Sequence, residues 1–175
     1  MIVRGCSVAA LVVLLIATAA QAQMERGNWE LTLAAVGSND KDFNDFAVGV
    51  NAGVGYFLTD WLELGGRQTL SYSKLEGSSA TDASSAFAVD LHLPLLDGRL
   101  MPFIGGNFGF FYGDTIHDSI EYGPEAGVKY FVNSTTFIYG RVEYEIFSND
   151  ILGSSSTGSS QDRQFVYLIG IGLRF

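Results

Sequence analysis

Cysteine, basic residues and long apolar runs are scarce in this chain of 175 residues, and each scarcity excludes a class of protein. The only cysteine, Cys6, lies near the amino terminus, so disulfides cannot stabilise the rest of the chain. After residue 22, no apolar run approaches the roughly 20 residues of a membrane-spanning helix. Proline is nearly absent, whereas glycine and aromatic residues are abundant.

The charge balance is acidic, with 10 Lys and Arg against 19 Asp and Glu, a formal net charge of −9. Because no stretch resembles a basic stripe, we expect no nucleic-acid partner. Two histidines, with no cysteine after Cys6, make a transition-metal site unexpected. We therefore expect no metal site and no cofactor.

The first 22 residues have the pattern of a cleaved secretory signal peptide. Arg4 supplies a positive charge, and an apolar run follows at 8–20. Ala20 and Ala22 flank Gln21 in a small-x-small cleavage site. We expect two parts, a signal peptide at 1–22 and a single domain at 23–175.

Eight segments of the mature chain alternate between two kinds of side chain. In each segment one parity is mainly apolar or aromatic, with Gln68 as the clear exception in the third segment, and nearly all polar residues fall on the other parity. In the last segment the apolar row includes Tyr167, Ile169, Ile171, Leu173 and Phe175. The eight segments are 28–37, 45–56, 61–73, 85–95, 101–113, 118–132, 135–147 and 163–175.

Alternation alone also fits a soluble sandwich, but three further features favour a membrane barrel. The polar parity contains many glycines, which suit a narrow lumen. Aromatic residues gather near the strand ends, and short and longer polar connections tend to alternate. We predict an eight-stranded antiparallel up-and-down transmembrane β-barrel, with longer connections at 38–44, 74–84 and 148–162 and a bulge at Pro124.

Three stretches carry a resemblance to a known family. Residues 55–65 (GYFLTDWLELG), residues 123–132 (GPEAGVKYFV) and the last strand ending at Phe175 resemble the small outer-membrane barrels of the OmpX/Ail and OmpA-transmembrane type. The resemblance implies an outer-membrane location, contact with membrane lipid and lipopolysaccharide, and recognition of the last strand by the barrel-assembly machinery. Members of this broad family include structural proteins, adhesins, small pores and, rarely, lipid-modifying enzymes.

Charged residues of the polar parity are expected to face the lumen, where acids outnumber bases. An ion-paired plug that holds the barrel shut is one interpretation, because buried charges need partners. A narrow, cation-favouring water path is the alternative, because surplus carboxylates form an acidic lining. The residues of this predicted lumen network are Glu30, Glu63, Arg67, Asp90, His92, Glu121, Glu125, Lys129, Arg141, Glu143, Glu145 and Arg174.

Two other possibilities concern catalysis and the loops. His117, Ser119 and Glu121 are similar to the His-x-Ser and glutamate of lipid A deacylase barrels, but Ile120 stands where that family has Asn, so we expect no catalytic residues. Loop acids are candidates for calcium or magnesium bridging to lipopolysaccharide phosphates, and a surface ligand would also bind at the loops. These acids are Asp40, Asp42, Asp45, Asp114 and Asp118. The leading hypothesis is a structural or adhesin-like surface protein with a plugged lumen, ahead of a low-conductance pore and a lipid A-modifying enzyme.

Overall fold

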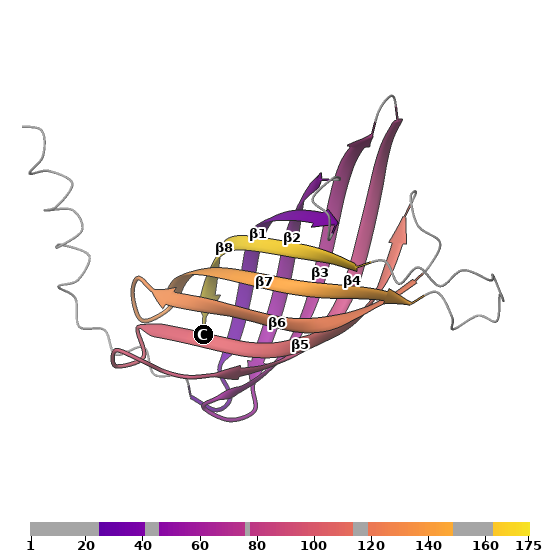
Figure 1. Ribbon diagram of the computed structural model, residues 1–175. Coiled ribbons are helices and arrows are strands. Elements are labelled where there is room, and N and C mark those ends of the chain that lie inside the picture. Colours follow the sequence, from indigo (N-terminus) through magenta and orange to yellow (C-terminus); the bar gives the residue numbers. More distant parts are fainter. Residues whose placement is uncertain (1–24, 41–45, 76–77, 114–118, 149–162) are drawn as a thin grey trace, which may run out of the picture.

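Eight strands form one closed antiparallel barrel in sequence order, with β8 returning to pair with β1 (Figure 1). The computed structural model describes residues 25–40, 46–75, 78–113, 119–148 and 163–175. In this part of the chain no helix is long and apolar enough to cross a membrane. The strands are β1 (Trp29–Asp40), β2 (Phe46–Phe57), β3 (Leu62–Leu75), β4 (Ser78–His92), β5 (Leu100–Gly113), β6 (Ser119–Phe131), β7 (Thr136–Ser148) and β8 (Arg163–Arg174).

The pairing register fixes the tilt of the strands and the width of the lumen. Following paired residues once around the barrel from Leu173 of β8 leads back to Arg163 of the same strand, a displacement of ten residues. A stagger of this kind requires strands tilted by about 35–45° to the barrel axis. A barrel of eight strands is just wide enough for side chains to fill its interior.

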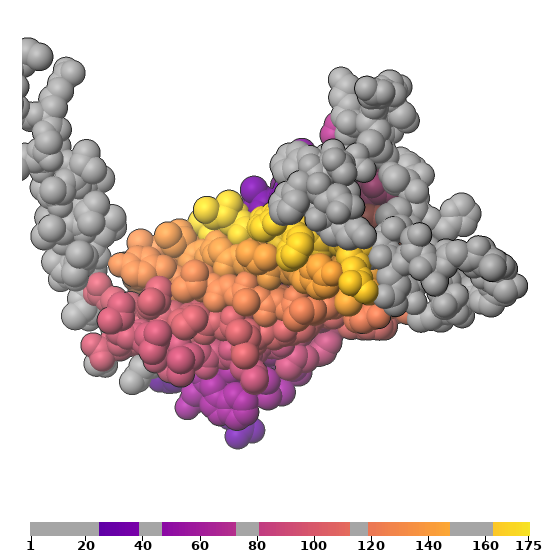
Figure 2. Space-filling model, in the orientation of Figure 1, coloured from indigo at the N-terminus to yellow at the C-terminus, as the bar shows by residue number. Residues whose placement is uncertain are grey.

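The side chains separate into the inward and outward sets that the alternation predicted. Ile169 is 73% exposed and Ile104 is 64% exposed on the outer wall, whereas Glu30 is fully buried inside. The face of the barrel formed by β5 to β8 is a continuous wall of closely packed atoms (Figure 2). An apolar exterior around a polar interior is the inverse of a soluble protein, and it confirms the predicted fold class.

The described connections at one end of the barrel are short, and side-chain oxygens close two of them, the β2–β3 and β6–β7 turns. Asn133 Oδ1 accepts hydrogen bonds from the backbone amides of Thr135 and Thr136, at 2.9 and 2.8 Å. Thr59 Oγ1 accepts one from the amide of Leu62 at 3.1 Å. Asn and Thr are suited to this role because their short side chains reach the backbone two or three residues on.

The prediction of a long connection at 74–84 was wrong. Strand β4 begins at Ser78, and the ladder between β3 and β4 continues to the pair Leu75–Ser78. Serine, alanine and threonine at 78–85 resemble a loop in composition, but pairing with β3 satisfies their backbone groups as strand. Pairing of β3 with β2 stops at Tyr72 and pairing of β4 with β5 stops at Asp82, so the tip of this hairpin projects beyond its neighbours (Figure 1).

The bulge predicted at Pro124 is also absent. On one side Pro124 pairs with Gly106 of β5 in an unbroken ladder. On the other side the ladder to β7 omits Gly123 and Pro124 and resumes at Glu125 in the same register. The missing proline N–H thus interrupts the ladder locally without inserting a residue, so every side chain after Pro124 keeps its face.

Gly123 provides a test of this close strand contact. A Cβ at Gly123 would lie 1.8 Å from the carbonyl oxygen of Tyr144, so Gly123→Ala must push β6 and β7 apart. We expect the free energy of unfolding to fall by about 1–3 kcal/mol, as measured by urea titration of the protein folded in lipid vesicles. Gly66→Ala is the matched control, because its Cβ would meet nothing nearer than Val54 Cγ1 at 3.7 Å. An equal loss in both variants would contradict the contact.

Candidate functional site: a two-level charge network in the lumen

The lumen holds two ion-pair networks, an upper one farther from the short turns and a lower one nearer to them. Arg67 forms the centre of the upper network. Its Nη1 and Nη2 donate to Glu125 Oε2 and Oε1 at 2.6 and 2.8 Å, a bidentate pair. Nη2 also donates to Asp90 Oδ2 at 2.8 Å, and Nη1 lies 3.5 Å from Glu143 Oε1. Asn107 Nδ2 adds a hydrogen bond to Glu125 at 3.0 Å. The planar guanidinium therefore binds side chains from several strands at once.

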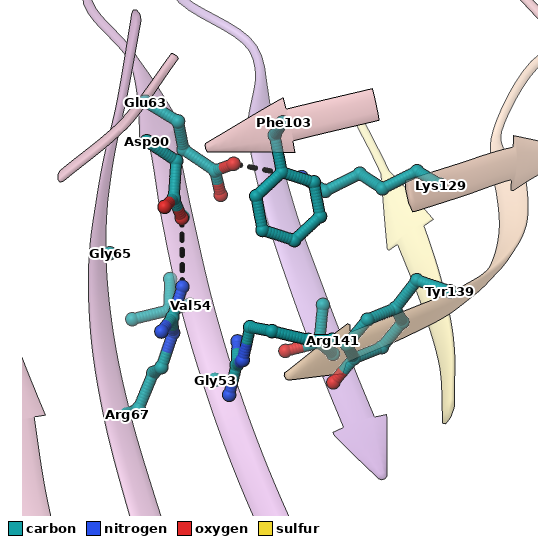
Figure 3. A pocket seen from close by; sticks show the side chains of 12 residues that line it. Gly53, Val54, Glu63, Gly65, Arg67, Asp90, Phe103, Lys129, Tyr139 and Arg141 are labelled. Carbon is teal, nitrogen blue, oxygen red and sulfur yellow. Dashed lines mark hydrogen bonds and ion pairs between the residues drawn. The ribbon is translucent and has the colours of Figure 1, made fainter. Parts of the chain in front are cut away.

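Lys129 forms the centre of a second, lower network. Its ammonium donates to Glu30 Oε2, and to Glu63 Oε2 at 2.8 Å. Glu63 Oε2 also lies 2.8 Å from His92 Nε2. Figure 3 shows Lys129 directed toward Glu63, and Arg67 directed toward Asp90. All four of these lower side chains are buried, so each charge depends on its partners rather than on water.

An aromatic floor surrounds the lower network, and sequence reasoning missed it. Phe57, Met101 and Phe137 are fully buried and Phe131 is 2% exposed, at the end of the barrel with the short turns. The Lys129 ammonium lies 5.3–5.8 Å from three ring centroids, those of Phe57, Phe103 and Phe137. These cation–π contacts stabilise a buried ammonium. The available signal was parity, because Phe131 follows Lys129 by two residues and therefore shares its face.

Two glycines leave room for these side chains. A Cβ at Gly55 would lie 1.8 Å from Glu63 Oε1, and one at Gly172 would lie 2.1 Å from Phe137 Cζ. The glycines of the polar parity thus allow a large side chain on the neighbouring strand to cross the lumen. This agrees with the narrow lumen expected for eight strands.

The charges balance poorly toward the loop end of the lumen. Arg141 Nε lies 2.6 Å from Glu143 Oε1, an ion pair too bent for a hydrogen bond. Glu145 accepts from Gln164 Nε2 at 2.6 Å. Among the described residues, neither Glu145 nor Glu121 forms an ion pair, although both are buried. The surplus of acid therefore collects at this end.

Glu63, Asp90 and His92 bring their potential metal ligands within 4.8 Å of one another. However, the Lys129 ammonium and the Arg67 guanidinium already contact two of them, Glu63 and Asp90. A cavity of ≈ 20 Å³ lies between the two networks and is lined by Glu63, Arg67, Asp90 and Lys129. That is room for about one water molecule. Protein cations thus occupy the positions in which a metal ion would neutralise these acids.

The remaining predicted residues are placed as follows. Arg174 lies at the floor, with its guanidinium carbon 5.1 Å from the Phe131 ring centroid. The last-strand residues Tyr167, Ile169, Ile171, Leu173 and Phe175 are exposed on the outer wall. Ser119 is buried, and its hydroxyl has no hydrogen-bond partner among described residues. The signal segment, His117, Asp42, Asp45, Asp114 and Asp118 lie outside the described residues, and of Asp40 only the backbone is described.

Arg67→Leu tests the energetic role of the upper network. The substitution leaves Asp90 and Glu125 buried without their cation, so we expect the free energy of unfolding to fall by about 3–5 kcal/mol. Arg67→Lys should lose less, because it keeps the charge but not the bidentate bond. Adding Glu125→Leu to Arg67→Leu should recover part of the loss. Urea titrations in lipid vesicles measure all three, and identical losses for the Leu and Lys variants would contradict a charge-based role.

Comparison with known proteins agrees with this architecture. The family described as "Outer membrane protein beta-barrel domain" matches residues 8–175. A comparison with curated proteins gave no match. The fold is similar to Neisserial surface protein A, with a TM-score of 0.65, 13% identity, and coverage of 85% of this chain and 96% of that one.

Two further barrels show the same fold. The outer membrane protein OprG of Pseudomonas aeruginosa has a TM-score of 0.61 and 12% identity, over 89% of this chain and 99% of its own. Ail, the attachment invasion locus protein of Yersinia pestis, has a TM-score of 0.56 and 13% identity, over 86% and 99%. This chain therefore belongs to the outer membrane protein β-barrel family, and its location is the outer membrane.

Proposed function

We propose that this protein is a structural or surface-interaction barrel whose lumen is closed to ions by the charge network. The observation that carries the proposal is that both networks span the lumen. Arg67 on β3 binds Glu125 on β6, and Lys129 on β6 binds Glu30 on β1. In a barrel of eight strands, each of these pairs joins strands three positions apart.

The aromatic floor supports the same proposal. Phe57, Phe131 and Phe137 contribute large buried side chains at one level, and Phe131 and Phe137 have ring centroids 5.1 Å apart. Apolar constrictions oppose ion passage because an ion must lose its water to enter. Ion pairs above and rings below thus form two barriers in series.

The outer end of the barrel supports a role in surface interaction. The β3–β4 hairpin extends beyond the paired part of both neighbouring strands, on the end opposite the short turns. Outer-membrane barrels carry their short turns on the periplasmic side, so this hairpin would project outward. The similar barrel Ail is named for attachment and invasion. By analogy, we propose that this protein binds a surface ligand at its outer end. Separately, we propose that the barrel-assembly machinery recognises β8.

Single-channel recording tests the closed lumen. The refolded mature protein should be silent in a planar bilayer, because an ion would have to pass both the ion-pair bridges and the aromatic floor. The double variant Arg67→Ser with Phe137→Ala should conduct, since it removes one bridge and part of the floor. Heat-modifiable gel mobility verifies that both proteins are folded. Steady currents through the wild-type barrel would disprove the proposal.

A low-conductance, cation-favouring pore is the alternative, and Glu121 and Glu145 favour it. These buried acids form no ion pair among the described residues and would attract cations at the outer entrance. In that case the wild-type currents would be cation-selective. Glu121→Gln combined with Glu145→Gln would then reduce the selectivity, whereas a closed barrel would stay silent.

We propose no catalytic role. Ser119 faces the lumen, away from the lipid on which a lipid-modifying barrel would act, and no described base contacts its hydroxyl. Mass spectrometry of lipid A from cells that make the wild-type protein, Ser119→Ala or an empty control should give identical spectra. A modified lipid A that requires Ser119 would establish an enzyme instead.

A further inference from the structure

Gln68 is a polar residue on the apolar, outward parity of β3, and the structure gives it two polar partners. Its Nε2 lies 3.0 Å from Tyr112 Oη on β5, and its Oε1 accepts from Ser85 Oγ on β4 at 2.6 Å. Ser85 Oγ and Tyr112 Oη are 3.0 Å apart. The three side chains close a ring of hydrogen bonds on the outer wall, which we call the polar triad.

The direction of each hydrogen bond in the polar triad is determined. Gln68 Nε2 also lies 3.3 Å from the carbonyl oxygen of Thr69, which only accepts, so the amide orientation is fixed. Ser85 must donate to Gln68 Oε1, and its single hydrogen is then used. Tyr112 therefore donates to Ser85 and accepts from Gln68. Every polar hydrogen of the three side chains is therefore used, either within the triad or on the Thr69 carbonyl, and only acceptor lone pairs remain for a partner.

The position of the polar triad points to membrane lipid as that partner. Gln68 is exposed, and Tyr112 is 38% exposed on the outer wall. Tyr112 is the penultimate residue of β5, at the end opposite the short turns, which places the triad in the outer-leaflet half of the wall. Small residues adjoin it, because Ala52 pairs with Gln68, and Gly66 lies next to Gln68 on the same face.

We propose that the polar triad binds an outer-leaflet lipid that carries hydrogen-bond donors, an amide N–H or a hydroxyl, where its acyl chains are attached. A donor of this kind complements the acceptor-only triad. The low surface at Ala52 and Gly66 accommodates the chain beside it. An ester-linked lipid offers only acceptors at this depth and leaves the triad without a partner. This proposal is independent of whether the lumen conducts.

Two lipids with one headgroup test the donor requirement. Sphingomyelin carries an amide N–H and a hydroxyl below its phosphocholine, whereas phosphatidylcholine of equal chain length carries ester groups. Native mass spectrometry of the refolded mature protein, released from micelles with each lipid, measures retention. We expect the wild-type barrel to retain sphingomyelin about five-fold more strongly, the value of one additional hydrogen bond.

Variants then locate the preference. Gln68→Leu and Ser85→Ala should abolish it, and Tyr112→Phe should weaken it because it frees one Gln68 N–H for ester carbonyls. Leu70→Ala, on the same strand and face as Gln68, is the control and should keep the wild-type preference. Heat-modifiable mobility verifies folding, and either single variant suffices if the other fails to fold. Equal retention of both lipids by the wild-type protein, or an unchanged preference in Gln68→Leu and Ser85→Ala, would overturn the proposal. The triad would then serve only to link β3, β4 and β5 through side-chain hydrogen bonds.

Discussion

The pairing of β8 with β1 is the interaction on which the remaining structure depends. In a bilayer core there is no water to satisfy an exposed strand edge, and each unsatisfied backbone group costs several kcal/mol. Closing the sheet removes both edges at once. It also directs alternate side chains to a lipid-facing wall and to a confined lumen. Polar side chains must therefore lie in the lumen, at the loop end, or in clusters on the wall whose members hydrogen-bond to one another.

Closure at a stagger of ten residues gives the lumen its limited width, and width governs how charge is accommodated. Side chains from opposite walls meet across it, as Arg67 and Glu125 do, and in the lower network Gly55 leaves the space that Glu63 occupies. In this confined space each ion-pair partner is needed, because leaving a buried charge unpaired costs much more free energy than the intact pair contributes to stability. The same confinement turns Phe57 and Phe137 into a floor and a cation–π cage for Lys129.

The lumen and the outer wall solve the problem of buried polarity differently. Inside, opposite charges from several strands neutralise one another around Arg67 and Lys129. On the wall, Gln68, Ser85 and Tyr112 are neutral and use their hydrogens on each other and on the Thr69 carbonyl. A neutral ring is tolerable in hydrocarbon, whereas an exposed charge at this depth is not. The two solutions give separate candidate roles, closure of the lumen and selection of lipid.

The fold class and the facing of each strand were readable from residue order, because a strand's side chains alternate strictly and nearly all charged residues fall on one parity. Composition misled where it competed with pairing: the serines at 78–85 lengthen β4, and Pro124 interrupts one ladder without a bulge. Which acid meets which base was not readable, since Arg67 and Glu125 are 58 residues apart and meet only through the register of four strands. Parity assigns a side chain to a face, but contact across the lumen depends on stagger and barrel width, which arise only when the sheet closes.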